Sequence, residues 1–261
     1  MNMYKICPIL ATLSPTPALH AFFKHRRRMY KGKDNHVWLA CGESRRPCGL
    51  WELPMNFEIS FHGDHNEITI HVPDLKRPAR YLKNFLHAGR IRCMGDGNRV
   101  EIGVSRFWIK DGLEIEMQKG GCLTIGRDCW LQADVCIYVH GWNHAGITLG
   151  DEVVIARDGT IRNHDKHTII DLETKSPANP PESVVLGNHL WLTQRVTVLK
   201  GTHLNDGCIV ANLAVVSGDF KEPNCLVAGV PAKVVKRNVT WDIRTFAEYA
   251  LGEKKENVPR Q

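Results

Sequence analysis

Several common signatures are missing from this chain of 261 residues. It contains no apolar window of the roughly 18 residues that a membrane-spanning helix needs, and its proline-broken start is a poor signal peptide. It has no Gly-x-Ser-x-Gly nucleophile elbow and no His-Glu-x-x-His zinc motif. Gly95 and Gly97 are not followed by the Lys-Ser/Thr pair and helix of a phosphate loop. These absences argue against a membrane-spanning protein, a serine hydrolase of the elbow type, a zincin and a P-loop enzyme.

The nine cysteines include no metal-type Cys-x-x-Cys pair. Cys122, Cys129 and Cys136 are seven residues apart, which is not a zinc spacing. Several cysteines stand where a small apolar residue is expected, and this predicts buried free thiols and no metal. Unpaired thiols are typical of a reducing compartment, so we expect a cytoplasmic protein.

The net charge of +6 is modest, and the only dense basic run is Lys24–Arg28, followed by Lys31 and Lys33. A nucleic-acid site usually needs a concentrated basic stripe, so we expect no nucleic-acid partner. A solvated face explains the run better. Loose contact with an anionic membrane surface is compatible with it as well.

A period of six residues dominates the second half of the sequence. Aliphatic residues recur at every sixth position, with one exception at Asn143, and then again after a break of about twenty residues. The first run is Ile125, Leu131, Ile137, Leu149, Ile155 and Ile161, and the second is Leu186, Leu192, Val198, Leu204, Val210 and Val216. Positions four residues after each are mostly small or aliphatic. This period fits neither an α-helix nor a single long strand.

A triangular solenoid fits a six-residue period, since each hexapeptide forms one short strand and one corner, and three make a coil. We therefore predict an all-β fold, a parallel β-helix over residues 61–236, interrupted by a loop insert at 162–183. Residues 1–60 form an irregular N-terminal region, and 237–261 form a C-terminal helix and tail that caps the open end. An ordinary β-sandwich with coincidental spacing is the alternative.

Two earlier segments, 61–70 and 95–102, share Gly-Asp-x-Asn followed by alternating apolar residues. They are interpreted as degenerate N-terminal coils. Residues 76–90 are expected to hold a short helix or a strained loop.

Three motifs carry a resemblance to a known family. The last repeats end in Ala228-Gly-Val-Pro-Ala-Lys233, and the insert begins Ile161-Arg-Asn-His-Asp-Lys-His167, with Gly187-Asn-His-Leu-Trp191 downstream. Together they resemble the hexapeptide-repeat acyltransferases, most closely the capsular and exopolysaccharide O-acetyltransferases, over residues 95–236. The resemblance implies left-handed coils, a homotrimer, acetyl-CoA as the donor and a saccharide hydroxyl as the acceptor. The divergent first 90 residues are expected to determine acceptor specificity or to make peripheral contact with a membrane-associated polysaccharide assembly system.

The match places the family's catalytic histidine at His167. An imidazole titrates near neutral pH, so it can take the proton of a sugar hydroxyl that attacks the acetyl thioester directly. Asp165 or Asp171 is expected to orient the ring. His164 stands where the family has Ser, and a second base, a substrate contact and no role all stay open for it.

The resemblance implies further roles around this histidine. Trp191 should point outward and lie beside the pantetheine arm of CoA; packing against another subunit is the alternative. The other CoA candidates are two small residues and two lysines, Ala211, Gly229, Lys233 and Lys236. The acceptor candidates, with a solvent-exposed corner as the alternative, are His140, Trp142 and His144.

Three other functions fit the same solenoid. N-acetylation of an amino sugar or another small acceptor would use the same donor. A zinc enzyme like the γ-carbonic anhydrases would need a His-x4-His pair, whereas His140 and His144 are separated by three residues. A non-catalytic scaffold would not bind CoA and would have no use for the three motifs.

Overall fold

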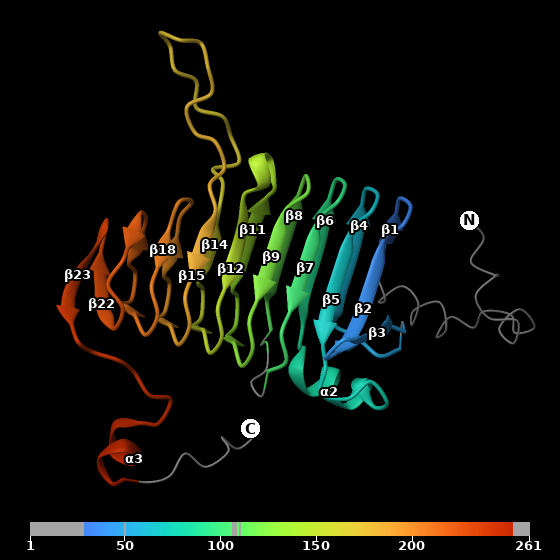
Figure 1. Cartoon of the computed structure of the whole chain (residues 1–261), viewed down its shortest axis with the longest axis horizontal. Coiled ribbons are helices and arrows are strands. Elements are labelled where there is room, and N and C mark those ends of the chain that lie inside the picture. The colour runs from blue at the N-terminus through green and yellow to red at the C-terminus, as the bar shows by residue number, and fades with distance from the viewer. Residues whose placement is uncertain (1–28, 50, 106–108, 110, 253–261) are drawn as a thin grey trace, which may run out of the picture.

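The computed structural model describes residues 29–49, 51–105, 109 and 111–252, which form a parallel β-helix of three sheets (Figure 1). The all-β class is therefore confirmed. The basic run up to Arg28 and the tail from residue 253 lie outside the described residues. No helix in the described part is long and apolar enough to cross a bilayer.

From residue 113 to residue 229, successive strands alternate in a fixed order, sheet A, then sheet B, then sheet C, whereas the earlier coils contribute strands to sheets A and B. Sheet A contains β1 (Met29–Lys31), β4 (Phe57–His62), β6 (Gly89–Met94), β8 (Leu113–Gln118), β11 (Cys136–His140), β14 (Thr160–Arg162), β17 (Thr197–Val198) and β20 (Val215–Val216). Sheet B contains β3 (Ser44–Pro47), β2 (His36–Cys41), β5 (Glu67–His71), β7 (Arg99–Ile102), β9 (Cys122–Ile125), β12 (Gly146–Leu149), β15 (Val184–Leu186), β18 (His203–Leu204) and β21 (Asp219–Phe220). Sheet C contains β10 (Trp130–Leu131), β13 (Val154–Ile155), β16 (Trp191–Leu192), β19 (Ile209–Val210), β22 (Cys225–Gly229) and β23 (Ala232–Arg237).

The interior of the prism is lined by the residues of the six-residue period. All twelve aliphatic members are at most 2% exposed, and neighbouring coils pair in register, for example Ile137 with Ile161 and Ile161 with Val198. Asn143, the exception, lies in an exposed 3-10 turn, η3 (Trp142–His144), which bulges from the corner between β11 and β12. The six-residue period therefore identifies the inward-facing residue of each strand, and its one exception lies in a corner that projects from the stack.

The sequence analysis predicted that the stack of coils begins at residue 61, but in the structure it begins earlier. β1, β2 and β4 already pair in parallel with the next coils. Their corners repeat Gly-x-x-Asn, and the asparagines form a ladder in which Asn98 donates to Asn66 Oδ1 (2.7 Å) and Asn66 donates to Asn35 Oδ1 (2.9 Å). Buried amides stacked in this way satisfy one another between coils. The expected pairing of segments 61–70 and 95–102 is present as β5 beside β7.

Both expected helices exist, but the second differs from its prediction. α2 (Pro78–Phe85) buries Leu82 and Phe85 against the core. α3 (Phe246–Ala250) has only five residues, none of them buried, and Figure 1 shows it beside the coils rather than over their end. The predicted C-terminal cap is therefore wrong. Instead, β23 closes the last coil by pairing antiparallel with β22.

The cysteine prediction holds for half of the described thiols. Cys93, Cys129, Cys208 and Cys225 are buried, and all described cysteines are free. Cys122, by contrast, points outward from β9 and is exposed. Strand alternation explains the difference, since adjacent residues of a strand face opposite sides.

Candidate active site

The insert leaves the stack between β14 and β15 and projects from the corner between sheets A and B (Figure 1). Its two limbs meet in an antiparallel bridge between Ile170 and Pro177. Asn179 holds the limbs together, because its Nδ2 donates to the backbone oxygen of His167 and to Asp165 Oδ2, both at 2.9 Å. Its Oδ1 accepts the backbone N–H of Ile169 at 2.7 Å. The insert is thus an ordered loop with an amide clamp at its base.

His167 is fixed through its backbone and exposed through its side chain. Its N–H donates to the carbonyl oxygen of Asp165 (2.8 Å), and its own carbonyl oxygen accepts from Asn179. This arrangement presents an accessible imidazole on a held backbone, as a general base requires.

Neither aspartate orients this ring in the described structure. Asp165 Oδ2 instead accepts from Lys200 Nζ at 2.6 Å and from Asn179. Burial raises the pKa of Asp165, but the hydrogen bonds from Lys200 and Asn179 outweigh it, so the pKa lies below its usual value. Asp171 Oδ1 accepts the N–H groups of Glu173 and Thr174 and shapes the loop tip. Both carboxylates therefore stabilise the loop.

His164 and His140 are brought together at the base of the insert. Their ring centroids are 5.6 Å apart, and His164 is only 8% exposed. Nδ1 of His164 accepts the backbone N–H of Lys166 (3.0 Å), and Nδ1 of His140 accepts that of Trp142 (3.1 Å). Buried Asn163 links the strands below them, since its side chain exchanges two hydrogen bonds with the backbone of His140. Burial is the main reason why the pKa of each histidine is lowered.

The other two acceptor candidates lie on η3, at the same corner of the prism. Trp142 is 62% exposed, and His144 is exposed as well. Asn143 and His144 both have positive φ, which turns this segment away from the coil. The corner between sheets A and B therefore gathers all three acceptor candidates and all three catalytic candidates.

Trp191 points outward from β16, and an unforeseen tryptophan lies beside it. The ring centroids of Trp191 and Trp241 are 6.1 Å apart. Trp241 stacks on His189 (4.7 Å, 12° between planes) and donates its indole N–H to the His189 carbonyl oxygen at 2.9 Å. Nε2 of His189 lies 3.1 Å from the Trp241 carbonyl oxygen. The chain after β23 thus runs back along the corner between sheets B and C, on the opposite edge of Figure 1 from the insert.

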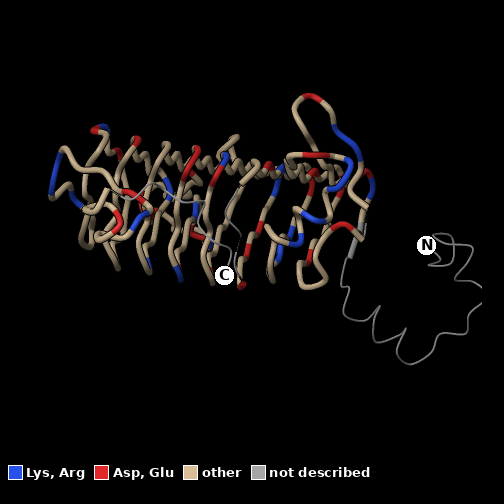
Figure 2. The backbone as a smooth tube through the Cα atoms, turned by 90° about the horizontal axis from the view of Figure 1, so that it is seen from below, with Lys and Arg blue, Asp and Glu red and all other residues tan. Residues whose placement is uncertain are grey.

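The remaining donor candidates share sheet C with Trp191, near its C-terminal end. Ala211 follows β19 and donates its N–H to the Val227 carbonyl oxygen (2.9 Å). Gly229 ends β22 with a φ of +101°, a conformation that a side chain would strain. Lys233 and Lys236 are exposed on β23, and Figure 2 shows basic residues at this end of the solenoid.

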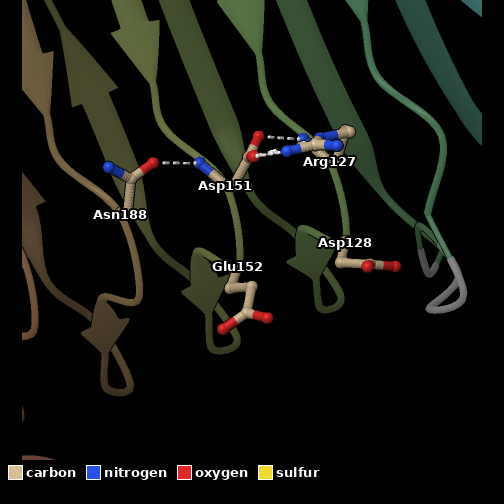
Figure 3. Close-up of a pocket in the computed structure, with 5 residues that line it drawn as sticks. All are labelled: Arg127, Asp128, Asp151, Glu152 and Asn188. Carbon is tan, nitrogen blue, oxygen red and sulfur yellow. Dashed lines mark hydrogen bonds and ion pairs between the residues drawn. The ribbon is translucent and has the colours of Figure 1, made fainter.

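A groove of about 480 Å³ lies at the corner between sheets B and C and contains none of the predicted site residues (Figure 3). Asp151 fills it by accepting from the backbone N–H and guanidinium of Arg127, both at 2.7 Å, while its own N–H donates to Asn188. Asp128 and Glu152 add negative charge. Because the arginine is already paired, this groove is a ladder of corner contacts and a poor site for the phosphates of CoA.

The sequence analysis did not single out Asn179, Lys200 or Trp241. The only sequence signal for Asn179 was its position in the insert, where the six-residue period is interrupted. Lys200 and Trp241 act on residues 35 and 52 positions away, and no local pattern reveals such pairs. Among the described residues, no group of three or more His, Cys, Asp or Glu side chains is placed to hold a metal ion.

Comparison with known proteins agrees with this architecture. The polysialic acid O-acetyltransferase of Neisseria meningitidis is 31% identical over 180 residues, 61% of this chain and 82% of that protein. The polysialic acid O-acetyltransferase of an Escherichia coli strain is 28% identical over 142 residues, 54% of this chain but only 45% of that protein. This chain therefore spans less than half the length of the second relative. No family model matches the chain.

Two solved structures share the fold. The crystal structure of the polySia-specific acetyltransferase NeuO matches with a TM-score of 0.62 and 23% identity, over 87% of this chain and 93% of that one. The polysialic acid O-acetyltransferase OatWY matches with a TM-score of 0.51 and 21% identity, over 88% of this chain and 98% of that one. The chain therefore has the left-handed β-helix fold of these two structures. It belongs to the hexapeptide-repeat acetyltransferases.

Proposed function

We propose that this protein transfers the acetyl group of acetyl-CoA to a hydroxyl group of a surface saccharide, with His167 as the general base. The observation that carries the proposal is the exposed imidazole of His167 on a backbone clamped by Asn179, in the insert that interrupts the solenoid. The names of the relatives support a polysaccharide acceptor.

The chemistry follows from the needs of the two substrates. A sugar hydroxyl is a weak nucleophile, so His167 takes its proton as the oxygen attacks the thioester carbon. The bond from carbon to sulfur then breaks, and the imidazolium returns the proton to the departing thiolate. No acetyl-enzyme forms, since both substrates are bound at once.

A homotrimer brings the donor and acceptor sites together. The donor candidates lie on sheet C, whereas His167 projects from the corner between sheets A and B, one sheet width away. Packing of prisms side by side would place the insert of one copy against sheet C of the next, where Trp191 is 39% exposed. Trp191 would then line the path of the pantetheine arm, and Lys233 and Lys236 would face its phosphates.

The test is release of free CoA thiol with a panel of neutral and acidic polysaccharides, comparing wild type with His167→Asn. We expect turnover to fall by about 10²-fold or more, the usual worth of a general base. His65→Asn is the matched control, because His65 is also exposed and its positive φ suits asparagine. A His167→Asn variant as active as wild type contradicts the proposed base. Transfer to amino groups alone would identify an N-acetyltransferase instead.

A further inference from the structure

His140 and His164 have a property that distinguishes them from His167. In each ring Nδ1 accepts a hydrogen bond from the backbone N–H two residues further along the chain. A neutral imidazole has one N–H and one lone pair. If Nδ1 uses its lone pair to accept, the proton must be on Nε2, which is then a donor.

This tautomer excludes two roles for the pair. A general base needs a free lone pair, and in these rings the lone pair is already bound to backbone. A metal ligand through Nε2 needs the same lone pair, so the closeness of the two rings is not a metal signature. A second proton on Nδ1 would face the backbone N–H from which Nδ1 now accepts a hydrogen bond. In agreement with this, the pKa of each ring is lowered.

Charges of both signs surround the two donors, and the carboxylate of Glu116 is already paired with Arg92. Lys119 lies near His140, and Arg162 lies near His164; Glu116 and Asp165 are the opposing charges, and Asp165 is already paired with Lys200. The buried Nε of Arg162 has no hydrogen-bond partner among the described residues. Within the same part of the chain, neither Nε2 makes a hydrogen bond that would use its donor.

We propose that His140 and His164 form a paired N–H donor site for a negatively charged oxygen at the base of the insert. The ring centroids lie 5.6 Å apart, and we infer from this closeness that both donors serve one small oxygen-bearing group. Two sources share this chemistry, a carboxylate on the acceptor saccharide and the oxyanion that develops on the transferring acetyl group. The inference rests on the proposed function for the reaction, but the tautomers can be measured without it.

Two substitutions at His164 separate donation from the other roles. In His164→Asn the amide oxygen can still accept from Lys166, but the donor at the Nε2 position is gone. In His164→Gln the amide nitrogen replaces that donor, and the acceptor for Lys166 is lost. We expect the Asn variant to lose about 10–10²-fold in kcat/KM, as for a hydrogen bond to a charged group, and the Gln variant to keep most activity.

The kinetic pattern identifies the oxygen. If it is an acceptor carboxylate, the Asn variant raises KM for carboxylated acceptors and leaves neutral ones unaffected. If it is the transition-state oxyanion, kcat falls with every acceptor. Equal loss in both variants, as for a base, overturns the proposal. A larger loss in the Gln variant than in the Asn variant also overturns the proposal, because it indicates a residue that only anchors Lys166. Full activity in both variants overturns it as well.

Nitrogen-15 NMR of histidine-labelled protein gives the second readout, with the His164 signals assigned as those missing from His164→Gln. We expect a protonated Nε2 and an unprotonated Nδ1; the opposite tautomer overturns the proposal. If wild type has no turnover with any acceptor, the proposed function fails separately. Titration with glucuronate, with glucose as the control, then decides. A shift of the Nε2–H signal supports the donor site, and no shift overturns it.

Discussion

Replacing Asn179 by alanine tests how the insert holds its histidine. The side chain makes three hydrogen bonds, two of them to the backbone of His167 and Ile169 and one to Asp165. At about 1 kcal/mol each, their loss weakens docking of the loop by about 3 kcal/mol, or about 10²-fold in the ratio of released to docked loop. A misplaced catalytic group costs a similar factor, so we expect kcat to fall by up to about 10²-fold.

The assay combines steady-state kinetics with thermal unfolding. The three bonds lie outside the stacked coils, so the melting temperature of Asn179→Ala should stay close to that of wild type. Asn205→Ala is the control, since its side chain bonds to Lys221 and Asp206 within the stack, and it should lower stability while leaving kcat unchanged. Unchanged kcat in Asn179→Ala, or an equal loss of stability in both variants, would refute the clamp.

Three further predictions concern the coils, the insert and the C-terminal segment. Asn98→Ala removes the side-chain bond to Asn66 and one of the two acceptors of the buried Gly121 N–H, so we expect about 1–3 kcal/mol of destabilisation in urea unfolding; no change would remove the ladder from the account. The lowered pKa of Asp165 means that its ion pair stabilises the insert fully above its ordinary value of about 3.9 and loses this effect as the pH falls through the lowered pKa. Limited proteolysis should cut the insert faster below about pH 4, and a Lys200→Met variant should show a weaker dependence, because only the Asn179 bond to Asp165 remains. Trp241→Ala should release the segment after β23 from His189, seen as faster cleavage there, and an unchanged cleavage rate would contradict the observed contacts.

The six-residue period was sufficient to predict the prism, because one inward aliphatic residue per strand is what a triangular coil requires. It failed before residue 61 because those coils are joined by longer corners, and only the Gly-x-x-Asn at 32–35 signals the earlier start. The apolar spacing of the C-terminal segment predicted a helix that caps the solenoid, but α3 has only five residues and none of them is buried. Trp241 lies within the predicted C-terminal segment 237–261, yet it packs on His189 outside any helix.

The candidate site was only partly accessible from sequence. The interrupted register indicated the insert, and the family match indicated His167. That Asp165 pairs with Lys200 rather than with the histidine depends on how a later coil stacks below the loop. The closeness of His140 and His164 follows from the parallel register of β11 and β14, which the repeat implies only once the coil length between them is known.

Incubation of the wild-type protein and His167→Asn with labelled acetyl-CoA and a surface polysaccharide, followed by isolation of the polysaccharide, tests the central claim most directly. We expect label in an alkali-labile ester on the saccharide with wild type, and about 10²-fold less of it with the variant. Label that never reaches the saccharide, or that reaches it equally with both proteins, would contradict an acetyltransfer catalysed by His167.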